Sequence, residues 1–135
     1  MPKQKPINLK SKFEEFTWGF IKHLCKGLKQ KPKVEYESTK LRYVVPVRNG
    51  FYLPDFVITF PDGRIRFIEA KGYFRAQDRT KMKLVKEANP DLDIRLLFVR
   101  DNKIHKDGKL TYSGWAIKYG FPWSVGNVPK EWLHD

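Results

Sequence analysis

The hydrophobic pattern is clearest between residues 52 and 72, where two apolar runs rich in Val, Ile and Phe flank the tripeptide Pro61-Asp62-Gly63. This tripeptide is typical of a three-residue hairpin loop, in which a type I turn is followed by a glycine in the left-handed region. The pattern therefore predicts a β-hairpin in which Phe60 pairs with Arg64.

Three other segments are predicted to be helices. Residues 11–29 predict an amphipathic helix, because their apolar side chains recur at a spacing of three to four residues. A second helix is predicted over residues 76–88 and ends at Asn89-Pro90, since proline does not continue a helix. A short third helix is predicted over residues 113–119. The apolar positions of the first helix are Phe13, Phe16, Phe20, Ile21, Leu24 and Leu28.

Extended segments complete the pattern. Residues 34–40 predict a strand with charged alternate positions, and residues 94–99 predict a buried strand. Residues 41–47 are extended and apolar but contain Pro46, which removes a backbone donor and favours an edge or a bridging segment. Strands separated by helices indicate a single α/β domain with a mixed sheet flanked by helices.

The predicted hairpin brings two acidic residues together. Counting back from the loop sets Val57 opposite Phe67 and Asp55 opposite Glu69, with Lys71 next on the same face. Opposed like charges are destabilising unless something compensates them, and a divalent cation would do so. Hard oxygen ligands favour magnesium or manganese over zinc. The alternative is a solvent-exposed sheet face on which Lys71 pairs with one of the acids.

The charge composition of the chain suggests the kind of substrate. With 27 Lys and Arg against 15 Asp and Glu, the chain of 135 residues has a formal net charge of +12. Such charge favours nucleic acid, bound through its phosphates, over a merely soluble basic protein. The single cysteine, Cys25, excludes an internal disulfide, and no apolar run approaches the roughly 20 residues that span a membrane. We therefore expect an intracellular protein with no organic cofactor and no membrane partner.

The acidic pair lies in a recognisable motif. Pro54-Asp55 followed by Glu69-Ala70-Lys71 resembles the PD-(D/E)xK motif of restriction-enzyme-like nucleases. From about Ser11 to Trp132 the chain is similar to the endonuclease I family of short-tailed coliphages, which are Holliday-junction resolvases. The further segments that carry this resemblance, in order, are Glu35-Tyr36-Glu37, Tyr43-Val44-Val45-Pro46, Asn89-Pro90-Asp91-Leu92-Asp93-Ile94-Arg95, Val128-Pro129 and Glu131-Trp132.

The resemblance implies a restriction-endonuclease-like fold and a site with two Mg²⁺ ions, for which Mn²⁺ would substitute. Asp55 would bridge both ions, Glu69 and the Ala70 carbonyl would hold the first, and Glu14 would help to hold the second. Lys71 would orient the attacking water, and hydrolysis would leave a 5′-phosphate and a 3′-hydroxyl. From the residues alone Glu14 is ambiguous, because the spacing Ser11-x-x-Glu14 is also that of a helix capping box.

The resemblance also implies an intertwined homodimer. Residues 11–40 would be exchanged between subunits and residues 41–50 would bridge the two halves. Each site would then combine Glu14 of one chain with the remaining residues of the other. A symmetric dimer presents the same surface twice and so suits paired cuts at a four-way junction.

Contacts to DNA are predicted from exposed basic positions. Residues 1–10 indicate a flexible basic arm, for which the alternative is a solvated tail without function. The basic residues of the second helix could contact phosphates, or could simply form its solvated face. We expect the tryptophans of the C-terminal tail to fill the core rather than to stack on bases. The candidate DNA contacts are Lys10, Lys12, Arg75, Arg79, Lys83 and His105.

Two other functions remain open at this stage. One is an endonuclease on the same scaffold that nicks or cuts linear duplex at a chosen sequence, as a homing enzyme does. The other is a non-catalytic DNA-binding protein with a decayed site, which the presence of Asp55, Glu69 and Lys71 argues against.

Overall fold

The computed structural model describes residues 9–45 and 48–134, so residues 1–8 of the predicted basic arm lie outside it. Its centre is a five-stranded sheet in the order β1-β4-β5-β6-β7. β1, β4 and β5 are antiparallel neighbours, whereas β5, β6 and β7 run parallel. The predicted mixed sheet is therefore confirmed. The strands are β1 (Lys33–Tyr36), β4 (Phe56–Thr59), β5 (Ile65–Lys71), β6 (Asp93–Phe98) and β7 (Trp123–Val125).

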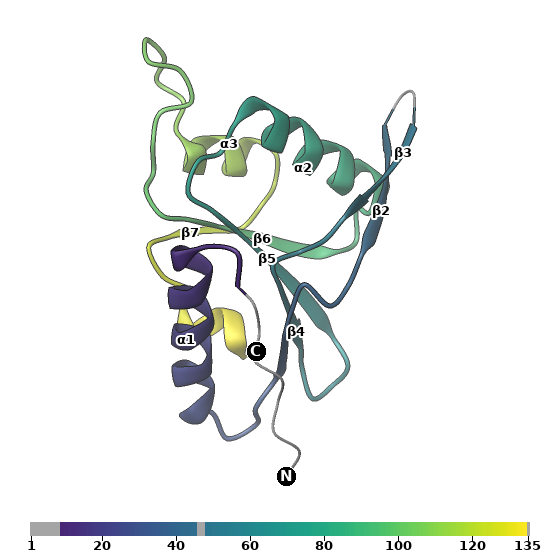
Figure 1. Ribbon diagram of the computed structural model, residues 1–135, viewed down its shortest axis with the longest axis vertical. Helices are drawn as coiled ribbons and strands as arrows, with labels where there is room; N and C mark the ends of the chain where they lie inside the picture. The colour runs from purple at the N-terminus through teal and green to yellow at the C-terminus, as the bar shows by residue number, and fades with distance from the viewer. Residues whose placement is uncertain (1–8, 46–47, 135) are drawn as a thin grey trace.

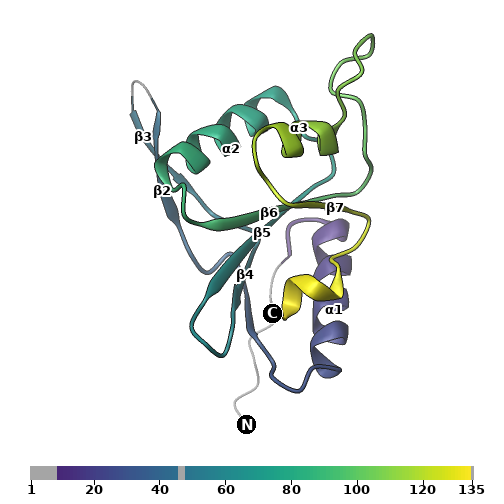
Figure 2. The same cartoon turned by 180° about the vertical axis from the view of Figure 1, so that it is seen from behind.

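Helices cover both faces of this sheet (Figures 1 and 2). α1 (Lys12–Lys26) and the 3₁₀ helix η1 (Lys130–Leu133) pack on one face, and α2 (Ala76–Ala88) and α3 (Tyr112–Lys118) pack on the other. Alternate residues of each central strand enter the two cores, as the twofold period of a strand requires. In β4, for example, Phe56 and Ile58 lie in the α1 core.

The central hairpin forms as predicted. The Phe60 N–H donates to the Arg64 carbonyl at 2.8 Å, and Gly63 adopts a left-handed φ of +91°. The register sets Val57 against Phe67, also as predicted. Local turn chemistry thus determines the strand pairing that leads to the acidic residues.

The segment after β1 differs from the prediction. β1 ends at Tyr36, well before residue 40, because Glu37 turns the chain with a left-handed φ of 47°. β2 (Leu41–Val45) then pairs with β3 (Arg48–Tyr52) in a separate two-stranded sheet, which projects beside α2 (Figure 1). The edge position predicted for the proline-containing segment is confirmed up to Val45. Pro46 itself lies outside the described residues.

The remaining predictions are largely confirmed. α2 has the predicted bounds, and α1 begins after Ser11, whose hydroxyl accepts from the Glu14 N–H at 3.1 Å. In the C-terminal tail Trp132 is buried, but Trp123 is 38% exposed, so the core role predicted for Trp123 is wrong. The reason is that Trp123 lies on β7, an edge strand of the sheet. Among the described residues, no helix is long and apolar enough to cross a membrane.

Candidate active site

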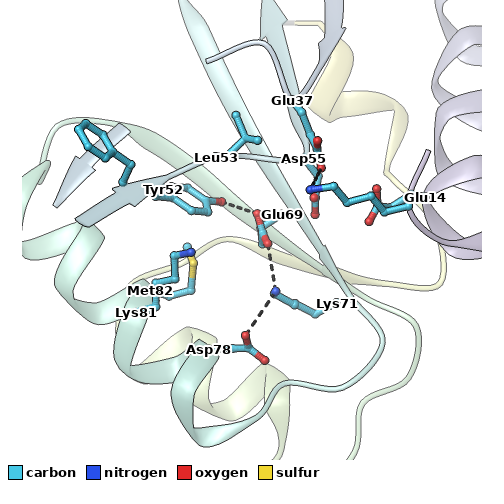
Figure 3. Close-up of a pocket in the computed structure, with 12 residues that line it drawn as sticks. Glu14, Glu37, Tyr52, Leu53, Asp55, Glu69, Lys71, Asp78, Lys81 and Met82 are labelled. Carbon is cyan, nitrogen blue, oxygen red and sulfur yellow. Dashed lines mark hydrogen bonds and ion pairs between the residues drawn. The ribbon is translucent and has the colours of Figure 1, made fainter. Parts of the chain in front are cut away.

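One cavity of about 330 Å³ gathers the charged residues of several elements (Figure 3). It is bordered by the first turn of α1, the segment after β1, the end of β3, the end of β5 and the first turns of α2. Residues far apart in the sequence thus meet at one end of the central strands β4 and β5. Its charged lining consists of Lys10, Glu14, Glu37, Asp55, Glu69, Lys71, Asp78 and Lys81.

Asp55 and Glu69 form the buried part of this lining. Asp55 immediately precedes β4, and because Phe56 pairs with Ile68, the next positions outward are Asp55 and Glu69. Only 8% of Asp55 and 6% of Glu69 is exposed. The Asp55 Oδ2 accepts a hydrogen bond from the Ala70 N–H at 2.8 Å. The structure thus brings the predicted acidic pair into the cavity. That the Ala70 carbonyl binds a metal ion stays a prediction.

Burial and mutual repulsion disfavour the ionised forms of these two acids. Desolvation, followed by the charge of Glu69, raises the pKa of Asp55 from its ordinary value of 3.8 to about 8. Burial also raises the pKa of Glu69, although Lys71 and the Tyr52 hydroxyl oppose this shift. The carboxylates therefore lie where added positive charge would stabilise them.

Glu14 faces this cavity from α1. Its backbone N–H is capped by Ser11, but its carboxylate accepts a hydrogen bond from the Tyr36 hydroxyl on β1. The carboxylate is thus directed toward the sheet, and burial together with Glu14 raises the pKa of the Tyr36 phenol. The sequence left two roles open for the Glu14 carboxylate, one at the metal site and one in a helix capping box. Its direction toward the cavity favours the first.

Glu37 is a site residue that the sequence reasoning missed. Glu14, Glu37 and Asp55 each offer a carboxylate oxygen, and these oxygens lie within 4.8 Å of one another. The Glu37 N–H donates to the Asp55 carbonyl at 3.0 Å, which holds the left-handed turn against the strand end. The sequence marked Glu37 only as part of a family-like segment, and no local pattern signals the turn that brings it to the cavity.

Lys10 contacts the same carboxylates. Its Nζ lies 2.9 Å from the Glu37 Oε1, and its backbone N–H donates to the Tyr36 hydroxyl at 3.2 Å. The hydrogen bond to Glu37 and the charges of Glu37, Glu14 and Asp55 raise the pKa of Lys10. Lys10, predicted from the sequence to contact DNA, thus lies at the acidic cluster.

Lys71 is a partly buried cation of the cavity, with 25% of its side chain exposed. Its Nζ lies 3.2 Å from the Glu69 Oε1 and 3.5 Å from the Asp78 Oδ1 (Figure 3). Burial favours the neutral amine, but the charges of Glu69 and Asp78 outweigh burial and raise the pKa of Lys71. The raised pKa favours the ammonium form of Lys71, which is a hydrogen-bond donor. Asp78 was not predicted as a site residue. Its distance from Lys71 in the sequence does not indicate a contact, which forms only because α2 packs beside the end of β5.

The other predicted DNA contacts lie outside the cavity. Lys12, Arg75 and His105 are exposed, with His105 in the loop between β6 and α3. Arg79 donates to the Phe74 carbonyl at 2.6 Å, and the Lys83 Nζ lies 4.7 Å from the centroid of the Tyr119 ring. Their contact with DNA stays a prediction. The cavity lining instead includes Lys81, a basic residue of α2 that was not among the candidates.

A cavity with several carboxylates and a partly buried ammonium group is typical of enzymes that transfer or hydrolyse phosphate esters. Comparison with known proteins narrows this class. A family profile described as phage endonuclease I matches residues 7–135. Endonuclease I of Escherichia phage T7 is 35% identical over 122 residues, which cover 89% of this chain and 79% of the relative. Endodeoxyribonuclease 1 of Enterobacteria phage T3 is 35% identical over 116 residues, covering 84% and 74%.

The chain therefore belongs to the phage endonuclease I family. This confirms the resemblance drawn from the sequence motifs. Family membership by itself assigns no role to an individual residue. The roles of Glu14, Asp55, Glu69 and Lys71 therefore rest on the geometry of the cavity.

Proposed function

We propose that this protein is a metal-dependent DNA endonuclease that resolves four-way junctions by paired hydrolysis of phosphodiester bonds. The observation that carries the proposal is the buried pair of Asp55 and Glu69, with the Lys71 ammonium 3.2 Å from Glu69. Membership of a family whose relatives are named as DNA endonucleases, together with a net charge of +12, supports DNA as the substrate.

The donor set suits hard divalent cations. The candidate ligands are carboxylate oxygens, and those of Glu14, Glu37 and Asp55 lie within 4.8 Å of one another. Asp55, Glu69 and the Ala70 carbonyl would hold one Mg²⁺ ion, and Glu14 together with Asp55 would help to hold a second. Glu37 is a further ligand candidate for the second ion. Bound ions would lower the pKa of an attacking water and offset charge on the phosphate.

The protein's own groups would place the reactants. Lys71 stays protonated, so its ammonium donates to the attacking water or to a phosphate oxygen and does not remove a proton. Attack forms a P–O bond from the water oxygen and breaks the bond to the 3′ oxygen, which leaves with a proton. The products are a 5′-phosphate and a 3′-hydroxyl.

We further propose a homodimer in which residues 11–40 are exchanged and residues 41–50 form the bridge. The resemblance to the endonuclease I family supports this proposal. Phe16 on α1 and Phe51 on β3, which are 55% and 57% exposed, are side chains that a partner chain could cover. In the exchanged dimer Glu14 and Asp55 of one site come from different chains.

Mixing two inactive variants tests the exchange. Glu14→Ala and Asp55→Ala chains would be unfolded together, refolded and assayed for nicking. An exchanged heterodimer has one doubly defective site and one intact site, so nicking returns. A dimer without exchange has one defect in each site and stays inactive, which would contradict the exchange but not the nuclease.

The cleavage assay that tests the proposed function compares a fixed four-way junction with linear duplexes of the same arm sequences, at one stated salt concentration. We expect paired symmetric cuts near the branch with Mg²⁺, and none with EDTA. Cuts confined to one sequence, with or without a branch, would indicate a sequence-directed nicking or homing endonuclease instead. Binding without any magnesium-dependent cut would indicate a non-catalytic DNA-binding protein.

A further inference from the structure

Tyr52, the last residue of β3, is a core residue that reaches the cavity. Its side chain is 2% exposed, and its ring belongs to the hydrophobic cluster that contains Val57 and Phe67. Its hydroxyl donates to the Glu69 Oε2 at 2.6 Å (Figure 3). The ring is therefore part of the core, while the hydroxyl is part of the site.

This hydrogen bond matters because Glu69 is buried and both of its oxygens are engaged. The Oε1 lies 3.2 Å from the Lys71 Nζ, while the Oε2 accepts from Tyr52. A buried carboxylate needs such donors, and a donor to an ionised group forms one of the stronger hydrogen bonds in proteins. Two donors from different strands define the plane of the carboxylate more tightly than either would alone.

We propose that Tyr52 is a positioning residue, which acts through Glu69 by holding this carboxylate in the orientation that binds the divalent cation. The inference rests on the proposed function. Hydrogen bonds to metal-ligating carboxylates orient the ligand, and losing such a partner typically costs about 10- to 100-fold in metal affinity or activity.

The backbone of Tyr52 is held by its strand pairing. Tyr52 is paired with Leu41, and this pairing places the backbone from which the phenol extends. Packing alone would require only the ring, which phenylalanine also supplies. A second core tyrosine, Tyr112, belongs to the same cluster but does not line the cavity, so it provides a matched control.

The experiment compares Tyr52→Phe with Tyr112→Phe, since both lose one hydroxyl from the same core. Mn²⁺ binding without DNA is measured by calorimetry, and kcat and KM are measured on a four-way junction. We expect Tyr52→Phe to weaken Mn²⁺ binding about 10-fold and to lower kcat 10- to 100-fold with KM unchanged. Tyr112→Phe should stay within about twofold of wild type on both measures. Equal Mn²⁺ affinity in Tyr52→Phe and wild type would overturn the inference and leave the nuclease standing.

The same substitution in a Glu69→Gln variant tests whether Tyr52 acts through Glu69. In Glu69→Gln, the further change Tyr52→Phe should cause no additional loss of Mn²⁺ affinity, because the group through which the phenol acts is already altered. A further loss of the same size would overturn the inference. If wild type neither binds Mn²⁺ nor cuts DNA with it, the proposed function fails first, and this inference fails with it.

Discussion

The same strand, β5, carries two buried charged groups with opposite arrangements. Near its start, Arg66 is 8% exposed and donates to the Asp93 Oδ2 at 2.7 Å and to the Trp132 carbonyl at 2.8 Å. Arg95 also donates to Asp93, at 2.9 Å. Near the end of β5, Glu69 lies instead beside another acid, Asp55, with Lys71 as the nearby cation.

The pKa values express this difference. Burial disfavours the charge of Asp93, but the hydrogen bonds from Arg95 and Arg66 outweigh burial and lower its pKa. At Asp55, burial and the charge of Glu69 act in the same direction and raise the pKa to about 8. The structural cluster is balanced within the protein, whereas the cavity has five carboxylates against the three cations Lys10, Lys71 and Lys81. A divalent cation from outside would offset this excess of negative charge. Such imbalance in a cavity identifies a candidate functional site.

The largest expected effect separates the two clusters by activity. Asp55→Asn should lower kcat on a four-way junction by about 1000-fold or more, because several kcal/mol of transition-state stabilisation depend on the metal ligands. Asp93→Asn should stay within about threefold of wild type, since it lies in the balanced cluster. Single-turnover cleavage and gel-shift binding at the same salt measure both. Normal cutting by Asp55→Asn in magnesium would refute the site assignment.

The second largest effect concerns the stability that the buried Arg66–Asp93 cluster contributes. Arg66→Met should lower the free energy of unfolding by about 2–4 kcal/mol, because the Trp132 carbonyl loses its buried donor and Asp93 keeps only Arg95. The control is Arg64→Met, whose exposed ion pair with Asp62 is screened by solvent and should change the stability far less. Urea denaturation measures both changes. Equal losses for the two variants would show that the buried cluster is not a structural support.

A smaller effect is the pH dependence of the metal-free protein. The pKa of Asp55 is higher in the folded state than its ordinary 3.8, so the folded state binds more protons between pH 4 and about 8. Stability should therefore fall as pH rises through that window, and Asp55→Asn should flatten the fall. Asp93 has the opposite sign, because its lowered pKa contributes stability that is lost on acidification. Thermal melts in EDTA across pH give the slopes, and a rise in stability toward pH 8 would contradict the shift at Asp55.

The smallest effect concerns Lys10, whose ammonium contacts Glu37 in the acidic cluster. If this contact competes with a cation, Lys10→Gln should tighten Mn²⁺ binding by about two- to fivefold, the range expected of a largely exposed ion pair. Lys12→Gln, on the first turn of α1, is the control for general loss of charge. Calorimetry with Mn²⁺ measures the difference. Equal affinities for both variants would show that Lys10 does not compete.

Much of the fold follows from the sequence, because its signals are local. The Pro61-Asp62-Gly63 loop specifies one hairpin register, and that register leads Asp55 and Glu69 to adjacent positions. The strand break at Gly72 and the helix stop at Asn89-Pro90 likewise predict α2 with its observed bounds. A turn and a periodic face depend on neighbours in the chain, so a single sequence suffices to predict them.

The rest of the site depends on tertiary structure. Glu37 reaches the acidic cluster through a left-handed turn, Asp78 reaches Lys71 because α2 packs on the sheet, and Tyr52 reaches Glu69 from a hairpin that local pattern did not predict. These contacts join residues with no periodic relation in the chain. The sequence by itself determined the hairpin, the central acids and the family. Only the packing of separate elements decided which donors and further carboxylates surround those acids, because that packing depends on long-range burial and not on local pattern.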